Sequence, residues 1–392
     1  MLVKHLTVGW YRTYQSAEVE LEPGVNLFVG DNGFGKTNLV EAIHYLATLQ
    51  SHRVAGYLPL IQAGQAQAII RAKVSHGGRD VLLEAELNRD TKNRVAINKN
   101  PSARVRDLLG YVNTVTFAPE DLDIIKKDPS NRRAFIDDLV VQLTPRFAGI
   151  YADYERVLKQ RNTLLKSARN VGAKGSALST LDAWDDQLIS LGTQIVVARG
   201  QLVERMQPHL VEAYQQIAVA NNEPKILVKS SLLSVKVPSW QDEDEADDLE
   251  YLDNFDATHV TGLFKARVAA LRDKELERGL TLAGPQRDDL VLLLSGLPAK
   301  GYASHGESWS YALALRLAAR KLLREDSNSG DPVLILDDVF AELDAGRRQR
   351  LAEMVADNEQ VLITAAVADD VPAALNATVF HVKRGSVEKA TK

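Results

Sequence analysis

The feature that most constrains the fold of this chain is a glycine-rich turn inside the segment 27–43, LFVGDNGFGKTNLVEAI. Residues 30–37 fit G-x-x-x-x-G-K-[ST], the Walker A or P-loop pattern, which needs a buried strand before it and a helix after it. Glycines allow positive φ angles, so several backbone N–H groups can point into one concavity, where a phosphate lies against the positive end of the helix. The apolar runs on both sides supply that strand and helix. The sequence therefore predicts a phosphate-binding α/β unit.

The residues of this turn have separate expected roles in binding ATP and Mg²⁺. Lys36 would bring a positive charge to the β- and γ-phosphates, and Thr37 would offer its hydroxyl to Mg²⁺. The remaining residues that we expect to bind the nucleotide here are Gly30, Asp31, Asn32, Gly33, Phe34, Gly35 and Asn38. A glycine-rich turn can match the pattern by accident, but the flanking apolar strand and helix argue against that alternative.

A second motif, VLILDD at residues 333–338, has the Walker B shape of four apolar residues followed by two acids. Asp337 would hold Mg²⁺ through its water shell. Asp338 would stand beside the γ-phosphate, where it could orient or deprotonate the attacking water. The alternative is a buried strand that ends at a polar turn. Because this motif and the P-loop lie near opposite ends of the chain, a shared site would be assembled from two distant lobes.

A third motif, ASHGES at residues 303–308, precedes a strongly apolar helix. Ser304, Gly306 and the N-terminus of that helix would offer hydrogen-bond donors to an anion. An ordinary N-capped helix is the alternative. The position of the motif shortly before the Walker B acids matches the signature loop of ABC-type ATPases, and Glu342-Leu343-Asp344 matches their D-loop.

The pattern of apolar residues divides the chain into three parts. Residues 1–120 are strand-rich around one helix, residues 121–256 are mainly helical with apolar residues every three or four positions, and residues 257–392 are mixed again. The two ends resemble each other in class and the middle differs. We therefore expect an α/β domain that is divided by a helical insertion.

Composition and charge limit the classes of partner. The 392 residues are 45% hydrophobic and 25% charged, as in ordinary soluble proteins, and no stretch of about 18 apolar residues predicts a membrane span. The absence of cysteine excludes disulfides and fits a cytoplasmic protein. The net charge of −5 is concentrated in the acidic run 242–250, which we interpret as a solvated loop. Any nucleic-acid surface must therefore be a local basic patch.

Taken together, these motifs resemble the RecF family, the ABC/SMC-like ATPases of bacterial recombinational repair. The resemblance runs over essentially the full chain. It rests on LTVGWYRTY near the N-terminus, GDNGFGKTNLVEAI, TFAPEDLDIIKKDPSNRRAFID (116–137), GPQRDDL (284–290), ASHGESW and LILDDVFAELDAGRR. The combination of these segments is highly specific to the family, although any one of them alone is not.

The resemblance implies an ABC/SMC-type head with a short helical lever arm. It implies an ATP-dependent homodimer that encloses two nucleotides, binds DNA at duplex–single-strand junctions and, with RecR and RecO, promotes RecA loading. It also implies a weak DNA-stimulated ATPase in which Asp338 and Lys36 are catalytic. In such a dimer Ser304 and Gly306 would reach the partner's γ-phosphate, and Arg12 would contact phosphate.

Several positions depart from the family pattern. Glu307-Ser308-Trp309 follow the signature loop where glutamines and an arginine are common, and no glutamine follows Phe117 at the Q-loop position. Ala365-Ala366 stand where transporter ATPases carry a switch histidine. Asp338 is one methylene shorter than the usual glutamate. We therefore expect slow ATP hydrolysis.

Basic residues in the helical part are the candidates for DNA contact. They are Lys126, Lys127, Arg132, Arg133, Lys159, Arg161, Lys166 and Arg169. Charges scattered over solvated helix faces are the alternative. Since no sequence-reading motif is present, we expect contact with the phosphate backbone. A transporter ATPase subunit, a Rad50-like protein with a long coiled coil and a metabolic P-loop kinase are the competing functions. The missing switch residues argue against the transporter subunit, and the short helical insertion argues against the Rad50-like protein. The lack of an identifiable site for an acceptor substrate argues against the kinase.

Overall fold

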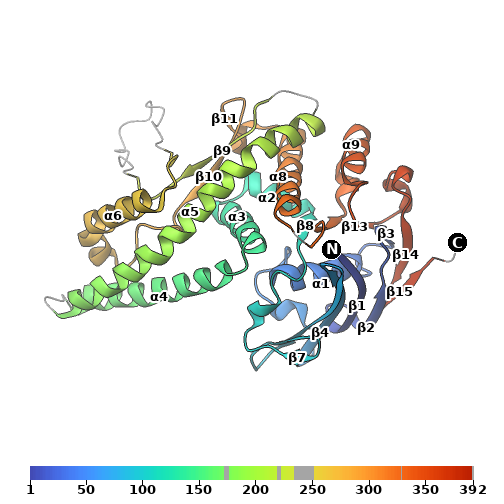
Figure 1. Ribbon diagram of the computed structural model, residues 1–392, viewed down its shortest axis with the longest axis horizontal. Coiled ribbons are helices and arrows are strands. Elements are labelled where there is room, and N and C mark those ends of the chain that lie inside the picture. The colour runs from blue at the N-terminus through green and yellow to red at the C-terminus, as the bar shows by residue number, and fades with distance from the viewer. Residues whose placement is uncertain (172–175, 219–221, 234–250, 328, 391–392) are drawn as a thin grey trace.

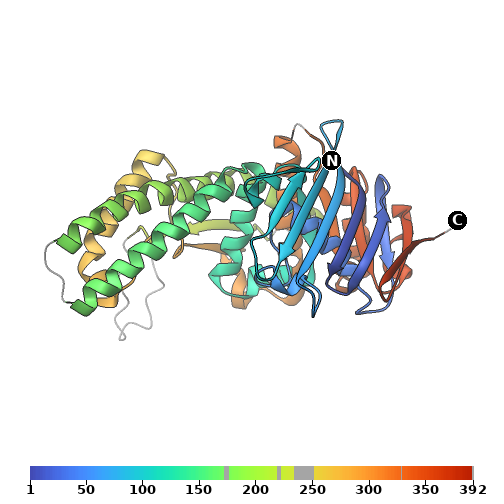
Figure 2. The ribbon, with the colours of Figure 1, turned by 90° about the horizontal axis from the view of Figure 1, so that it is seen from below.

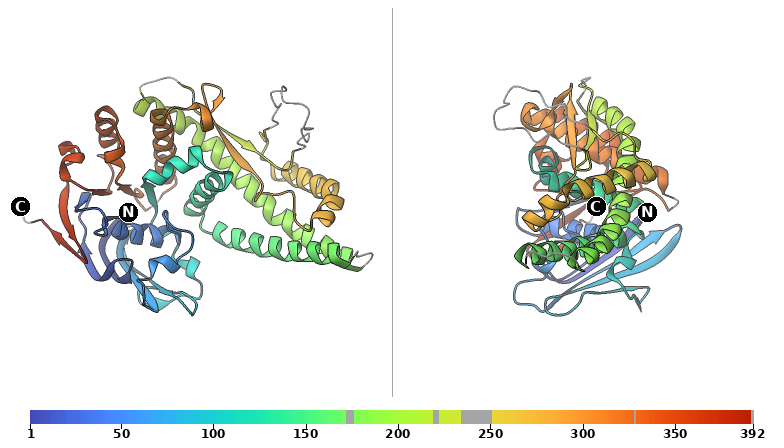
Figure 3. Two further views of the ribbon diagram at one scale, coloured as in Figure 1. Left: turned by 180° about the vertical axis from the view of Figure 1, so that it is seen from behind. Right: turned by 90° about the vertical axis from the view of Figure 1, so that its left-hand side faces the viewer.

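The computed structural model describes residues 1–171, 176–218, 222–233, 251–327 and 329–390, and the acidic run 242–250 lies outside them. Two sheets and the helices that cover them gather at one end of the molecule, and three long helices extend to the other (Figures 1 and 3). We call these two parts the head and the arm. The two ends of the chain meet in the head, so the expected assembly from N- and C-terminal lobes is confirmed.

A mostly parallel sheet forms the centre of the head. Its strands lie in the order β15-β14-β3-β13-β12-β8, and only the edge strand β15 is antiparallel to its neighbour. The bounds are β3 (Gly24–Val29), β8 (Thr114–Phe117), β12 (Val333–Asp337), β13 (Gln360–Ala365), β14 (Thr378–Lys383) and β15 (Ser386–Lys389). The P-loop strand and the Walker B strand thus lie on either side of β13.

The apolar runs of these strands are continuous because both faces of the sheet are buried. On β12, Val333 and Ile335 face one hydrophobic core, whereas Leu334 and Leu336 face the other. The first core lies around α1 (Lys36–Thr48) and a second sheet, and the other lies under the helices of the middle and C-terminal parts of the chain. Both cores therefore hold the central sheet rigidly, and with it the site at its edge.

The second sheet is antiparallel, in the order β2-β1-β4-β5-β6-β7, and covers α1 from outside (Figure 2). It alternates buried and exposed residues, as on β4, where Ala68, Ile70, Ala72 and Val74 point inward. Its strands are β1 (Leu2–Tyr11), β2 (Tyr14–Glu20), β4 (Gln67–His76), β5 (Arg79–Asn88), β6 (Arg94–Ile97) and β7 (Asn100–Pro101).

Helices of the middle and the C-terminal part complete the head. They are α2 (Leu122–Lys126), α3 (Pro129–Leu143), α7 (Ala299–Tyr302), α8 (His305–Asp326) and α9 (Ala345–Val355). The apolar helix α8 is buried along most of its length between the central sheet and the arm helix α5. Its N-terminus carries the signature loop, and Asp344 caps the start of α9 with a hydrogen bond from the backbone N–H of Arg347 (2.9 Å).

The arm consists of α4 (Phe147–Val171), α5 (Ser176–Ala218) and α6 (Ala257–Arg278). A small sheet of β9 (Lys225–Lys229), β10 (Asp289–Leu294) and β11 (Leu297–Pro298) lies where the arm meets the head. Helix α6 lies beyond the boundary at residue 256 that the sequence suggested, yet it packs on α4 and α5. Its buried residues, Val260, Phe264 and Val268 among them, join the core of the arm.

Two of the candidate DNA contacts are wrong. Arg161 is fully buried in the arm and forms ion pairs with Asp185 and Glu275. Arg132 is buried at the start of α3 and forms a two-pronged ion pair with Asp289. Buried arginines are retained because acids satisfy them, and neither guanidinium is free to meet a DNA phosphate.

Candidate nucleotide-binding site

The site lies where the parallel strands of the central sheet end, the usual position of ligands in open α/β sheets. The P-loop follows β3, Asp337 ends β12, and Thr364 lies near the end of β13. The hydroxyl of Thr37 donates a 2.8 Å hydrogen bond to Oδ1 of Asp337. The fold thus joins the predicted Walker A and Walker B residues in one place.

The P-loop has the backbone shape that its glycines allow. Gly33 and Gly35 have φ angles of 84° and 106°, a region costly for residues with a Cβ. A Cβ on Gly30 would overlap the backbone carbonyl of Val382. Asp31 and Asn32 are exposed at the rim and Phe34 is partly buried against the core. A glycine-rich loop with this backbone shape is suited to binding a phosphate chain.

Lys36 begins α1 and is buried, but its ammonium remains within the P-loop. It donates to the backbone oxygens of Gly30 (2.7 Å) and Asp31 (3.3 Å) and to Oδ1 of Asn32 (3.4 Å). Loop carbonyls are replaceable partners for a flexible lysine side chain, which carries a compact charge on four methylenes. The lysine is therefore positioned to transfer these bonds to phosphate oxygens.

Asp337 is a buried carboxylate with several hydrogen-bond donors. Besides Thr37, the hydroxyl of Thr364 donates to Oδ1 (2.6 Å), and Nε2 of His52 lies 3.4 Å from Oδ2. Burial raises the pKa of Asp337, but the hydrogen bonds from His52, Thr364 and Thr37 outweigh burial and hold the pKa below its usual range. The group is thus a carboxylate at neutral pH. A carboxylate beside a threonine hydroxyl offers the oxygen ligands that Mg²⁺ prefers.

Asp338 follows in a strained conformation. Its φ of 52° is left-handed, uncommon for a residue with a Cβ and typical of functional sites. Its backbone N–H donates to Oγ1 of Thr364 (3.0 Å). Burial and the neighbouring Asp337 raise the pKa of Asp338, and the positive charges of Lys36 and Arg53 partly offset this. A carboxyl of raised pKa suits the predicted role of accepting a proton from water.

A basic pocket of about 570 Å³ adjoins the start of α1. Arg12, Arg53, Arg89 and Asn38 contribute to its lining. Arg12, a predicted phosphate contact, forms a two-pronged ion pair with Glu41 of α1 (2.6 and 2.8 Å), which holds its guanidinium at the pocket wall. Asn38 accepts a bond from Arg53 (3.3 Å). This pocket would extend the phosphate site toward the rest of a nucleotide.

The signature loop does not contribute to this pocket. Ser304 is exposed and caps α8. Its hydroxyl accepts a hydrogen bond from the backbone N–H of Glu307, and its own backbone N–H donates to the side-chain carboxylate of Glu307. The guanidinium of Arg347 lies against Gly306. The polar N-terminus of α8 is therefore exposed at Ser304 and half-buried at Gly306.

Among the residues of the site that escaped the sequence analysis are His52, Arg53 and Thr364. The first two lie in the loop after α1, where no pattern marks them. Thr364 is the one polar residue near the end of the apolar strand QVLITA, and such a residue is a usable signal because strand ends line ligand sites.

Comparisons with known proteins show the family of this chain. The model of the RecF/RecN/SMC N-terminal domain matches residues 2–388. A protein of Clavibacter michiganensis subsp. michiganensis called DNA replication and repair protein RecF is 52% identical, and the match covers 100% of this chain and 96% of that protein. The chain belongs to the RecF family. A RecF of Streptomyces avermitilis is 51% identical, over 99% of this chain and 100% of that protein.

Two solved structures of other proteins are similar in fold to this RecF-family chain. A structure described as the recombination mediator protein RecF–ATP in the RecFOR pathway superimposes with a TM-score of 0.86 at 26% identity, covering 99% of this chain and 97% of that one. The head domain of an Smc protein from Pyrococcus furiosus has a TM-score of 0.54 at 14% identity, with 99% and 95% coverage, and shares the fold alone. The predicted ABC/SMC-type architecture and the family resemblance are confirmed.

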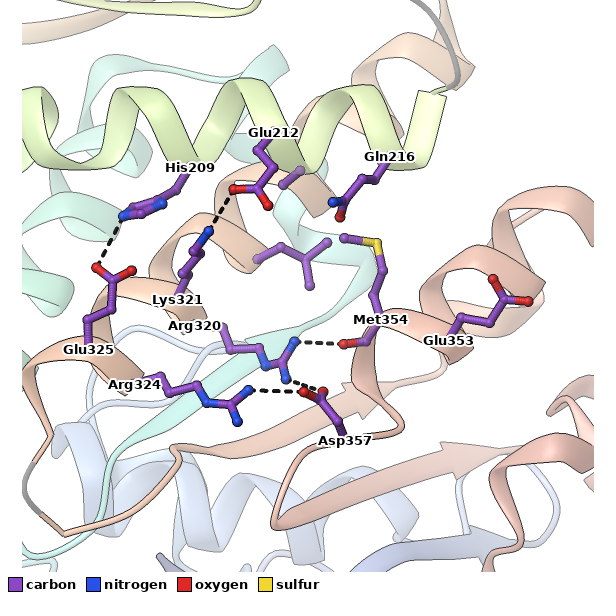
Figure 4. Close-up of a pocket in the computed structure, with 12 residues that line it drawn as sticks. His209, Glu212, Gln216, Arg320, Lys321, Arg324, Glu325, Glu353, Met354 and Asp357 are labelled. Atoms are coloured by element: carbon purple, nitrogen blue, oxygen red, sulfur yellow. Dashed lines mark hydrogen bonds and ion pairs between the residues drawn. The ribbon is translucent and has the colours of Figure 1, made fainter.

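Another pocket, of about 660 Å³, lies between α5, α8 and α9 (Figure 4). Its charged side chains neutralise one another, because Lys321 pairs with Glu212, His209 lies near Glu325, and Arg320 and Arg324 share Asp357. No excess positive charge is left for a triphosphate there.

Among the described residues, no helix is long and apolar enough to cross a bilayer.

Proposed function

We propose that this chain is an ATP-dependent DNA-binding protein of recombinational repair, in which ATP–Mg²⁺ drives the association of two copies around DNA. The observation that carries the proposal is the 2.8 Å bond between Thr37 and Asp337, residues 300 positions apart, at the mouth of a P-loop. The printed description of the related RecF–ATP structure supports the choice of nucleotide.

Different residues of the site would bind different parts of ATP–Mg²⁺. The P-loop amides, from Gly30 to Thr37, would bind the phosphates, and Lys36 would neutralise their charge. Thr37 and Asp337 would hold Mg²⁺, which when bound draws negative charge from the β- and γ-phosphates. Asp338 would orient the attacking water and accept its proton. Since this acid is short and no switch histidine follows β13, hydrolysis would be slow and would reset the dimer.

A second copy completes the site. Ser304 and Gly306 lie at the N-terminus of α8, where Ser304 is exposed, so this helix end could offer donors to a ligand carried by another molecule. In the proposed dimer they approach the γ-phosphate bound by the partner. Binding energy between copies is then available only when the triphosphate is present, which makes association depend on ATP.

The DNA-related part of the proposal rests on family membership and on charge. DNA at gaps or duplex–single-strand junctions would lie against exposed cations, of which Lys126, Lys127, Lys159, Lys166 and Arg169 remain candidates. The eighth predicted contact, Arg133, is half-buried and donates a 2.7 Å hydrogen bond to the backbone oxygen of Asp288. With RecR and RecO as cytoplasmic partners, the clamp would promote RecA loading. The description of the related structure as a recombination mediator of the RecFOR pathway supports this assignment.

Sedimentation velocity of the purified chain tests the dimer directly. We expect a monomer without nucleotide or with Mg²⁺ alone, and a dimer with ATP and Mg²⁺. Lys36→Ala removes the charge that the phosphates need and should abolish the shift. A chain that stays monomeric under all conditions would refute the nucleotide-driven clamp.

Ser304→Ala examines the contribution of the second copy. It should leave ATP binding by the monomer intact and block dimerisation. Because it also removes a helix cap worth about 1 kcal/mol, Asp256→Ala, which removes the cap of α6, is the matched control. The control should dimerise normally, and dimerisation of the Ser304 variant at wild-type ATP concentrations would count against the arrangement.

A further inference from the structure

His52 lies beside the Walker B acid, although no motif predicts it. It belongs to the loop that follows α1, and its side chain is only 8% exposed. Its Nε2 lies 3.4 Å from Oδ2 of Asp337. Its other ring nitrogen, Nδ1, is buried without a hydrogen-bond partner among the described residues. A buried imidazole whose single polar contact is a site carboxylate needs an explanation.

The hydrogen bonds of Asp337 show why this contact matters. Oδ1 accepts from the hydroxyls of Thr37 and Thr364. Oδ2 accepts, among the described residues, only from His52. The two hydroxyls on Oδ1 restrain the carboxylate through one oxygen against the soft rotation about its bond to Cβ. The imidazole N–H of His52 adds the restraint on the second oxygen, Oδ2.

The ring of His52 is itself held in place. His44 of α1 meets it edge to face, with ring centroids 5.3 Å apart and planes at 88°. Nδ1 of His44 lies 3.2 Å from Oγ1 of Thr114 and 3.0 Å from Oγ1 of Thr116, both on β8. Burial is the main cause that lowers the pKa of His44 well below its usual value, so this histidine is neutral and does not repel its neighbour. A chain of contacts thus runs from β8 through His44 and His52 to the Walker B acid.

We propose that His52 is a positioning residue, which orients the carboxylate of Asp337 so that its free lone pairs face the Mg²⁺ of the bound nucleotide. This inference rests on the proposed function, because it assigns a task within the same ATP–Mg²⁺ site. His52 is not a metal ligand in this arrangement, since its Nε2–H bond points at the carboxylate. Partners of this kind behind a metal-binding carboxylate typically change metal affinity or activity about 10- to 100-fold.

The test compares ATP binding by the full-length chain with Mg²⁺ and with EDTA, measured by calorimetry. In the wild type, Mg²⁺ should strengthen ATP binding. His52→Ala should bind ATP in EDTA as the wild type does, because the P-loop is intact, but should lose on the order of tenfold of the strengthening by Mg²⁺. His52→Gln, which keeps an N–H near the position of Nε2, should recover most of it. His259→Ala, at an exposed histidine at the start of α6, is the matched control.

The outcomes separate this inference from the function on which it rests. A wild-type chain that binds no ATP in either buffer would overturn both. Wild-type strengthening by Mg²⁺ in His52→Ala would overturn the role of His52 alone. An equal loss in the alanine and glutamine variants would show that ring packing matters and the bond does not, which also overturns it. If the alanine variant fails to fold, His52→Asn, whose amide is too short to reach Asp337, replaces it with the same expected loss.

Discussion

Arg161 lies among basic residues that suggest DNA contact, but its charged group stabilises the fold instead. Its guanidinium has no exposed surface and donates to Asp185 and Glu275 at 2.6 Å each, and to the hydroxyl of Thr281 at 2.8 Å. These partners come from α5, α6 and the segment after α6, so the arginine ties the three parts of the arm to α4. Its neighbour Lys159 on the same helix is exposed.

Replacement of Arg161 by alanine should destabilise the chain severely. Asp185 and Glu275 would remain buried without their main partner, and breaking a buried ion pair in this way costs about 3–5 kcal/mol. Lys159→Ala, at an exposed position, should change the free energy of unfolding by no more than about 0.5 kcal/mol. Urea unfolding followed by circular dichroism measures both. Equal midpoints for the two variants would contradict the buried network.

Asp138 makes stability depend on pH at the junction of α3 and the loop after α1. Burial raises its pKa to about 7, the adjacent Asp137 adds to the rise, and Arg316 and the bond from Gln50 offset only part of it. The folded chain therefore keeps a proton on Asp138 up to about pH 7, whereas the unfolded chain releases it near 3.8. The unfolded state binds fewer protons between these values, so this group lowers folding stability as pH rises from about 4 to about 7.

Asp138→Asn should remove this pH dependence. The stability of the variant relative to the wild type should rise by roughly 2–3 kcal/mol between pH 5 and pH 8, because the amide cannot ionise. Unfolding free energies at the two pH values test this, with Asp186→Asn on the exposed face of α5 as control. A relative stability that stays constant or falls with pH would contradict the assignment.

At the scale of elements, two glycines of α5 allow other segments to approach the helix backbone closely. The ring of Phe255 lies against Gly200, so that a Cβ there would overlap it, and the ring of Phe264 lies close to Gly192. Both aromatic residues are buried and precede or belong to α6. Glycine is costly inside a helix, and here close packing offsets that cost. The contact brings α6 onto the arm although it follows the predicted boundary.

Substitutions of glycine by alanine should therefore have opposite effects in two helices. Gly200→Ala should lower the free energy of unfolding by about 1–3 kcal/mol, because the ring of Phe255 must move. Gly262→Ala, at an exposed position of α6 with no atom within 4 Å of the new Cβ, should raise it by about 0.5–1 kcal/mol. Thermal unfolding monitored at two protein concentrations distinguishes these effects from association. Stabilisation by both substitutions would show that Phe255 is not packed there.

At the scale of the whole molecule, the arm carries exposed lysines that we propose as a surface for DNA. Lys159 and Lys166 are exposed on α4, line one shallow pocket and form no ion pair among the described residues. The exposed Lys4 and Lys321, by contrast, pair with Asp80 and Glu212. Unpaired lysines lose less when they meet a phosphate, because no internal ion pair has to be broken.

The double variant Lys159→Ala, Lys166→Ala should bind DNA more weakly without losing the dimer. Two phosphate contacts fewer should reduce the slope of log affinity against log salt by about 1.8 for duplex DNA. Lys4→Ala with Lys321→Ala removes the same charge and should leave that slope unchanged. Fluorescence anisotropy with gapped duplex at several salt concentrations measures both. An identical slope for the two double variants would exclude the arm as a DNA surface.

The sequence by itself determined the chemistry of contiguous residues and much of the class of fold. The P-loop, the Walker B strand and the capped signature helix are local, since their backbone shape depends on neighbouring residues and on glycines at fixed positions. Apolar runs beside these motifs then indicated buried strands and an apolar helix. Hence the sequence alone could predict a head assembled from two lobes, with the P-loop lysine Lys36 and the Walker B acid Asp337 in one site.

Only the tertiary structure decided which polar groups meet. His52 reaches Asp337, Arg161 turns inward to Glu275, and α6 joins the arm across the predicted boundary. Each of these depends on residues far apart in the chain whose proximity is set by packing. Burial and ion pairing change the free energy of a charged side chain by several kcal/mol, and the residue type alone does not show which surroundings it will have.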